Sequence, residues 1–308
     1  MSAIRDLSGI ICPLATPLND ERKIDEAGLR RLVGYVMDGG VHAVFAMGST
    51  GEFAAFSREE RRLVVETVVG EVAGRLPVLA GVSDSGTELA ARNARDAEAA
   101  GADAVVLTLP YYFPAHSDQA VLDHFRHVAG SVSLPLVIYN IPQIVKGAVA
   151  VEAVAELAEE GTAAAIKDSS ADFVYFQSLI FRLGDMPHFR ILQGSEFHLA
   201  AGLLMGAHGG VLGIANVAPG LCVQLYEAAS GGSPRRIKQA RELQRRLTAL
   251  SLIFQVGESP LGSLKAAMSM LGICSPVTTM PIPMASDESR RRIREIIEAQ
   301  VPDGKPSG

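Results

Sequence analysis

Lys167 is the residue whose setting in this sequence points most directly to chemistry. It ends a short apolar run, and the polar stretch Asp168–Ser170 follows at once. Of the six lysines in the chain, only Lys167 ends an apolar segment that is expected to be a buried strand. Burial disfavours the charged form of an amine and leaves it a nucleophile toward carbonyl groups. The pattern suggests Schiff-base chemistry, but this segment alone fits the structural alternative, a strand-end lysine paired with Asp168, at least as well.

Three further segments carry side chains suited to the same chemistry. The segment Gly48–Glu52 (GSTGE) combines glycines, whose N–H groups can converge on an anion, with the hydroxyls of Ser49 and Thr50. It suits a carboxylate or a phosphate, and the alternative is a plain turn. Tyr139 ends another apolar run, and a phenol near a lysine can transfer protons while an imine forms and breaks. Tyr112 belongs to an aromatic pair that predicts a substrate wall, a subunit contact or simple packing.

Eight short apolar runs rich in Val, Ile and Ala alternate with helical patterns. Such continuous apolar runs are typical of a parallel sheet that is covered on both faces. The predicted strands are Gly9–Ala15, Ala43–Met47, Val78–Val82, Ala104–Leu109, Leu136–Tyr139, Ala163–Lys167, Arg190–Leu192 and Gly210–Ile214. Between them, Asp25–Asp38 places its apolar residues on one helical face, Ser57 begins a capping box, and Thr87 is expected to cap the next helix.

A weak internal repeat indicates how these elements are arranged. A glycine followed by a strand recurs at Gly40, Gly101 and Gly161, about 60 residues apart, and two βα units of about 30 residues fit each interval. The sequence therefore predicts an α/β fold, a (β/α)8 TIM barrel over residues 1–232, with an open doubly wound sheet as the alternative. Because catalytic residues of such barrels lie at the carboxyl ends of the strands, the four candidate segments should face one cavity.

Residues 233–308 show no further strand pattern. We expect a small C-terminal helical region there, with a frayed polar tail over 301–308. The predicted helices are Arg235–Phe254, Gly262–Gly272 and Asp287–Ala299.

Composition limits the class of protein. The formal net charge of −6 and the pI near 5.7 argue against a nucleic-acid partner. The N-terminus lacks the apolar core of a signal peptide, and no uncharged apolar stretch approaches the roughly 18 residues of a membrane span. Three widely spaced cysteines fit a reducing compartment. We therefore expect a cytoplasmic protein with no membrane partner.

Taken together, the motifs resemble the dihydrodipicolinate synthase / N-acetylneuraminate lyase family of Schiff-base lyases. The matching segments follow the family's order and span essentially the whole chain: Gly48–Glu52, Pro110–Tyr112, Tyr139–Pro142, Ile166–Asp168, Gly194–Glu196 and Gly209–Val211. The resemblance implies a (β/α)8 barrel that assembles as a homotetramer, a dimer of dimers. It also implies an imine between Lys167 and pyruvate or another 2-keto acid, with Tyr139 as general acid and base.

The resemblance also assigns the remaining site residues. Ser49 and Thr50 would hold the keto-acid carboxylate and, in the synthase branch, pass protons toward Tyr112, which there comes from the neighbouring subunit. The further residues expected against the substrate are Gly48, Gly194, Val211 and Ile144. No metal and no organic cofactor is required by this chemistry, and no group of histidines has metal-ligand spacing.

One position departs from the synthase pattern. In that branch an arginine after the motif tyrosine binds the carboxylate of aspartate semialdehyde. Counting from Tyr139, Ile144 stands there, and an aliphatic side chain cannot make the bidentate contact. Losing a charged hydrogen bond commonly costs about 1.5–3 kcal/mol. Lys146 is a flexible point charge and only a partial substitute.

The predicted function is therefore a 2-keto acid lyase of the aldolase or dehydratase type whose second substrate is not aspartate semialdehyde. True 4-hydroxy-tetrahydrodipicolinate synthase activity is the alternative. Two other classes stay open: a phosphate-binding barrel enzyme that uses Gly209 and Gly210, and a non-catalytic keto-acid-binding or assembly protein.

Overall fold

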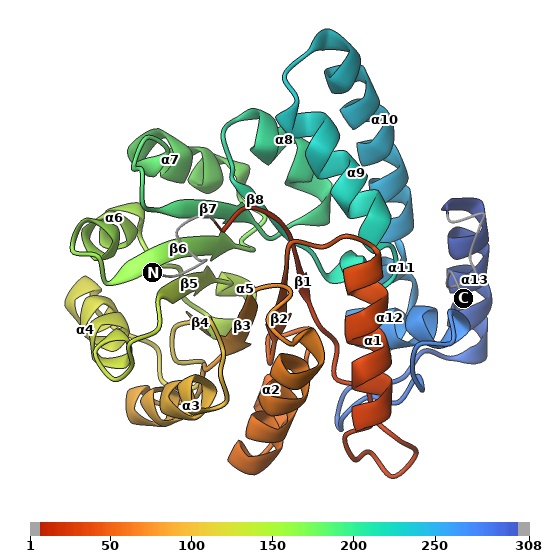
Figure 1. Ribbon diagram of the computed structural model, residues 1–308, viewed down its shortest axis with the longest axis horizontal. Coiled ribbons are helices and arrows are strands. Elements are labelled where there is room, and N and C mark those ends of the chain that lie inside the picture. The colour runs from red at the N-terminus through yellow and green to blue at the C-terminus, as the bar shows by residue number, and fades with distance from the viewer. Residues whose placement is uncertain (1–6, 301–308) are drawn as a thin grey trace.

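The computed structural model describes residues 7–300, in which eight parallel strands close into a barrel in chain order (Figure 1). The strands are β1 (Gly9–Pro13), β2 (Ala43–Ala46), β3 (Val78–Gly81), β4 (Ala104–Leu107), β5 (Leu136–Asn140), β6 (Ala163–Asp168), β7 (Arg190–Gln193) and β8 (Gly209–Val211). Strand β1 pairs with both β2 and β8, which closes the sheet. The predicted (β/α)8 barrel is confirmed.

All eight predicted runs form strands, although their ends differ from the prediction. The largest change is at β8, because Gly213 and Ile214 fall in the short 3-10 helix η4 (Gly213–Asn216) instead of the strand. Nearly every strand residue is buried, as expected for a sheet whose outer face is covered by helices.

Helices follow the strands, and most of them surround the barrel, whereas the short α5 lies over the strands at the centre of the view (Figure 1). They are α1 (Glu26–Asp38), α2 (Arg58–Val72), α3 (Thr87–Ala99), α4 (Asp118–Ala129), α5 (Pro142–Val145), α6 (Val151–Glu159), α7 (Phe173–Leu183), α8 (Leu199–Leu204) and α9 (Pro219–Ser230), with the 3-10 helices η2 (Phe53–Ala55) and η3 (Glu196–His198). The capping box of α2 is present as predicted, with Ser57 and Glu60 bonded reciprocally. The predicted cap at Thr87 is wrong: Gly86 precedes α3, and the Thr87 hydroxyl bonds His124 Nδ1 at 2.9 Å instead.

The C-terminal helices gather on one side of the barrel (Figure 1). They are α10 (Pro234–Ser251), α11 (Ile253–Val256), α12 (Pro260–Met270) and α13 (Asp287–Gln300). The first predicted helix is therefore split into α10 and α11. The domain boundary at 232/233 stays a prediction, and the predicted frayed tail lies outside the described residues. No helix within residues 7–300 has the length and apolar character needed to cross a membrane.

Candidate active site

Lys167 and Tyr139 meet at the carboxyl ends of two neighbouring strands. The two residues are register partners on β6 and β5, and each is only 4% exposed. Lys167 Nζ lies 3.9 Å from the centroid of the Tyr139 ring and 5.3 Å from that of Phe45 on β2. The amine is therefore held inside the barrel mouth between two aromatic rings, where cation–π attraction helps to fix its position.

The structural alternative, a pair between Lys167 and Asp168, does not form. Successive strand side chains point to opposite faces, so Asp168 is directed away from Lys167. Its carboxylate accepts hydrogen bonds from Asn140 Nδ2 at 2.8 Å and from the Ser170 hydroxyl at 2.9 Å. Burial raises the pKa of Asp168, and these hydrogen bonds oppose the rise. Within residues 7–300, Lys167 has no salt-bridge partner.

The loop after β2 brings hydroxyl groups to the same place. The Tyr139 hydroxyl is oriented to donate to Ser49 Oγ, and the distance of 3.5 Å makes this a long, weak hydrogen bond. The loop is a tight turn in which Gly51 N–H donates to Gly48 O and Glu52 N–H to Ser49 O, both at 3.0 Å. Predicted residues from the second, fifth and sixth strands thus converge.

The backbone of this loop is strained at both ends. Met47 and Glu52 both have φ near 58°, the left-handed region that non-glycine residues rarely adopt. Each such residue costs of order 1–3 kcal/mol and persists only where its surroundings enforce it. The surroundings must therefore hold the Ser49–Thr50 segment in place.

A buried ion pair anchors the loop to the C-terminal helices. Glu52 Oε1 lies 2.5 Å from Lys265 Nζ on α12, and both side chains are almost fully buried. Glu52 Oε2 accepts hydrogen bonds from the N–H and the hydroxyl of Thr279, each at 2.7 Å, and Lys265 donates to Val277 O at 2.8 Å. Burial lowers the pKa of Lys265, which the Glu52 charge opposes.

Glu196 ends the family-matching segment Gly194–Glu196, but we assigned it no role from the sequence. It follows β7 in the partly exposed start of η3. A methyl group built on Gly213 would lie 3.5 Å from Glu196 Oε1 and 3.8 Å from Thr50 Oγ1, so the carboxyl and the hydroxyl flank the same point. Burial of the carboxyl raises the pKa of Glu196, opposed by backbone N–H groups and by the charge of Lys167. Its place directly after a strand was the available signal.

Gly194 allows the loop after β7 to approach the end of β6. Gly194 N–H donates to Asp168 O at 2.7 Å, and a Cβ atom there would lie 2.1 Å from Ser169 Oγ. Any larger residue would therefore push the β7 loop away from the site. Val211 ends β8 and is buried, and Gly48 is buried at the start of the loop after β2.

Tyr112 does not enter the site of its own chain. Its side chain is 73% exposed and stacks edge-on against Phe113, with the ring centroids 4.9 Å apart. Tyr111 instead turns inward, with its ring centroid 6.0 Å from that of Phe53.

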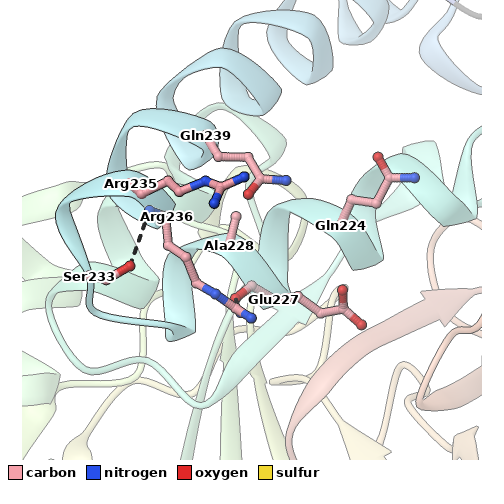
Figure 2. Close-up of a pocket in the computed structure, with 7 residues that line it drawn as sticks. All are labelled: Gln224, Glu227, Ala228, Ser233, Arg235, Arg236 and Gln239. Atoms are coloured by element: carbon pink, nitrogen blue, oxygen red, sulfur yellow. Dashed lines mark hydrogen bonds between the residues drawn. The ribbon is translucent and has the colours of Figure 1, made fainter.

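A cavity of about 410 Å³ adjoins the site, and Ser49 forms part of its wall. Its other walls come mainly from η2, from α5 with Ile144, and from the segment Thr279–Ile282. A separate polar hollow of about 350 Å³ lies between α9 and α10 (Figure 2). Arg236 there already donates to Glu227 O at 2.9 Å, and no predicted site residue lines this hollow.

The barrel and this site together define the class of protein. A buried lysine beside a phenol at the mouth of a (β/α)8 barrel, under a loop of hydroxyls and N–H groups, is the arrangement of a class I lyase, which works through a Schiff base.

Comparison with known proteins gives the family. The model of the Dihydrodipicolinate synthetase family matches residues 6–300. An uncharacterized DapA-like lyase of Halobacterium salinarum is 35% identical over 92% of this chain and 91% of its own length. A 4-hydroxy-tetrahydrodipicolinate synthase of Gluconacetobacter diazotrophicus is 33% identical over 94% and 95%. The chain therefore belongs to the dihydrodipicolinate synthetase family and is an enzyme of the class I Schiff-base lyase type.

Solved structures agree with this assignment. The dihydrodipicolinate synthase of Bacteroides thetaiotaomicron superposes with a TM-score of 0.89 at 39% identity, covering 95% of this chain and 98% of the other. YagE, a prophage protein of Escherichia coli K12 solved in complex with pyruvate, gives a TM-score of 0.91 at 27% identity, covering 96% and 98%.

Proposed function

We propose that the protein is a lyase that acts on pyruvate or another 2-keto acid through an imine on Lys167. The observation that carries this proposal is the position of one amine, 4% exposed, with Nζ 3.9 Å from the ring of Tyr139. Among the described lysines, Lys265 is the other buried one, and it is neutralised by Glu52.

The reaction follows from the chemistry of the imine. The amine of Lys167 adds to the keto carbon, and water leaves. With a 4-hydroxy-2-keto acid, the C4 hydroxyl then loses its proton, the bond between C3 and C4 breaks, and C4 leaves as an aldehyde. The protonated imine takes up the electrons of that bond and becomes an enamine. In the reverse direction the enamine carbon attacks an aldehyde carbon, the aldehyde oxygen takes up a proton, and water hydrolyses the imine to release a 4-hydroxy-2-keto acid.

The surrounding residues transfer protons and bind the keto-acid carboxylate. Tyr139 is the general acid and base, supported by its contact with Ser49 Oγ at 3.5 Å. Ser49, Thr50 and the N–H groups of their loop hold the keto-acid carboxylate. The remaining wall of the keto-acid site consists of Gly48, Gly194 and Val211.

The second substrate is not aspartate semialdehyde in this proposal. Ile144, at the position of the carboxylate-binding arginine, is 52% exposed and lines the cavity next to Ser49. The alternative, true 4-hydroxy-tetrahydrodipicolinate synthase activity, is favoured by the names of several relatives. A non-catalytic keto-acid-binding role would leave the pairing of Lys167 with Tyr139 without a purpose.

We further propose a cytoplasmic homotetramer, a dimer of dimers. Two exposed apolar areas support it: the Tyr112–Phe113 pair, and the outer face of α7 with Val174 and Phe181. Large exposed apolar patches commonly mark protein interfaces. In such an assembly Tyr112 would reach the site of a neighbouring subunit.

The test is trapping of the imine. The protein is incubated with pyruvate and borohydride, and the intact mass is measured. We expect a single reduced adduct that disappears in Lys167→Ala and persists in the matched control Lys146→Ala, whose lysine is exposed. Peptide mapping should place the adduct on Lys167. Absence of an adduct on the native protein would refute the proposal.

A further inference from the structure

We propose that the cavity beside Ser49 binds an uncharged, apolar group of the second substrate, so that the favoured partners of the 2-keto acid are aldehydes with an apolar chain. This inference rests on the proposed function and names the substrate class of the same site.

The cavity adjoins the reacting centre through Ser49. Ser49 lines it, and Ser49 Oγ is the atom 3.5 Å from the Tyr139 hydroxyl, whose ring covers Lys167 Nζ. Thr108, which directly follows β4, lines it as well. A substituent on the carbon that joins a Lys167-bound enamine can therefore extend past Tyr139 into this space.

The walls of the cavity are apolar and come from distant parts of the chain. Phe53, Ala54 and Ala55 of η2 form one side, and Ile144 and Val145 of α5 form another. The C-terminal segment Met280–Ile282 completes the enclosure. Apolar walls with a few polar groups at one end are the usual construction of a small-molecule site.

The charges near the cavity are already neutralised. Glu52, which lines it, is bound to Lys265 and Thr279. Behind Phe53, Arg61 pairs with Asp84 at 3.1 Å and donates to Ser83 O at 2.7 Å.

Among the described residues that line the cavity there is no Arg, Lys or His. A carboxylate placed there would find no cationic side chain to replace the hydration that it loses, which is unfavourable. The cavity therefore selects against an acidic substituent and in favour of an apolar one.

The size of the cavity fits a small organic group. Its volume of about 410 Å³ falls at the lower end of the roughly 300–1,000 Å³ typical of ligand pockets. Each methylene group buried against such walls should raise kcat/KM about fourfold until the space is filled.

The experiment measures condensation of pyruvate with matched aldehydes. We expect kcat/KM to rise about fourfold per carbon from propanal to pentanal. The critical pair is 4-methylpentanal and succinic semialdehyde, in which an isopropyl group replaces a carboxylate of similar shape. We expect the apolar member to be favoured at least tenfold.

Variants of the cavity wall test whether the lining of the cavity causes the preference for the apolar aldehyde. Ile144→Arg should reverse the preference within the critical pair, because it supplies a bidentate partner for the carboxylate. The control Leu89→Arg, at a residue of similar exposure on α3, should leave the ratio unchanged.

The borohydride adduct distinguishes a failure of the proposed substrate class from a failure of the proposed function. The substrate class is wrong, while the imine chemistry stands, if the adduct forms but the aldehydes fail to show the expected preference. Three results would show this: kcat/KM that does not depend on chain length, a preference for the acidic aldehyde, or no condensation with any aldehyde. If the Tyr112–Phe113 pair of a second copy filled the cavity, kcat/KM would not change with the chain length of the aldehyde. If no adduct forms, the proposed function itself fails.

Discussion

Tyr139 and Lys167 are neighbours because their strands are neighbours. Parallel pairing of β5 with β6 sets the two side chains at the same level, and the pleat directs both toward the interior. The preceding apolar residues bury the strands and therefore fix the amine without any ion pair. At this scale the proposed chemistry depends on the single hydroxyl of the tyrosine ring that covers that amine.

Tyr139→Phe removes this hydroxyl and keeps the ring that covers Lys167. We expect exchange of the pyruvate methyl protons with deuterated water, followed by NMR, to slow about 10²–10⁴-fold, the usual contribution of a general acid or base. Thermal unfolding should change little, since the hydroxyl makes only a long contact. An unchanged exchange rate would exclude Tyr139 from proton transfer.

Glu196→Gln should change the pH dependence of stability. Because burial raises the pKa of the native carboxyl above its ordinary 4.5, the ionised form is less stable in the folded state than in the unfolded state. This contribution is fully favourable below about pH 4.5 and is lost as pH rises through the native pKa. The melting temperature of the variant, measured relative to the native protein, should therefore increase from pH 4.5 to pH 8. A difference that is constant with pH would contradict the buried carboxylate.

At the scale of elements, the C-terminal helices support the candidate active site. Through Glu52, α12 and the segment around Thr279 hold the loop that carries Ser49 and Thr50. The same segment closes the apolar cavity. The loop therefore cannot relax its left-handed residues while this network is intact.

Breaking the buried ion pair should test this coupling. Lys265→Met leaves a buried carboxylate with only the Thr279 hydrogen bonds, and we expect a loss of about 3–5 kcal/mol in the free energy of unfolding in urea. The KM for the 2-keto acid should also rise.

The matched double variant Glu52→Gln/Lys265→Met removes both charges. It should cost clearly less than the sum of the two single variants, because the two sites are in contact. Strictly additive losses would show that the pair contributes no coupling.

At the scale of the whole molecule, exposed aromatic and aliphatic residues predict assembly. Phe181 on α7 is 94% exposed and Val174 on the same helix is 74% exposed, which is costly for a single chain in water.

Phe181→Glu should therefore convert the proposed tetramer to dimers in sedimentation velocity without loss of the folded state. The control Leu89→Glu, on the exposed face of α3, should leave the sedimentation coefficient unchanged. A native protein that sediments as a monomer would contradict the assembly.

The sequence predicted the barrel well because its signals are local. Continuous apolar runs mark strands buried on both faces, and the strand-end positions of Tyr139 and Lys167 were enough to place them together. The helix cap at Thr87 failed because its hydroxyl is taken by His124, a contact between α3 and α4 that propensity alone does not contain.

The parts of the site that could not be predicted depend on distant pairings. Glu52 and Thr279 are 227 positions apart, and no spacing or period connects them. The role of Glu196 became visible only when Gly213 and Thr50 were seen beside it. The apolar cavity draws its walls from five separate parts of the chain, so its lining could not be assembled from any one motif.

The pairing of β1 with β8, which closes the barrel, can form only late in the synthesis of the chain. On the ribosome, β1 emerges about two hundred residues before its partner Gly209–Val211. Until then the nascent sheet has two open edges, which are sites for mispairing. The loop that carries Ser49 is anchored even later, because Glu52 binds Thr279 and Thr279 must first emerge from the ribosome. Newly made chains should therefore need protection by chaperones, and ribosome-bound intermediates should lack enzymatic competence until Thr279 has emerged.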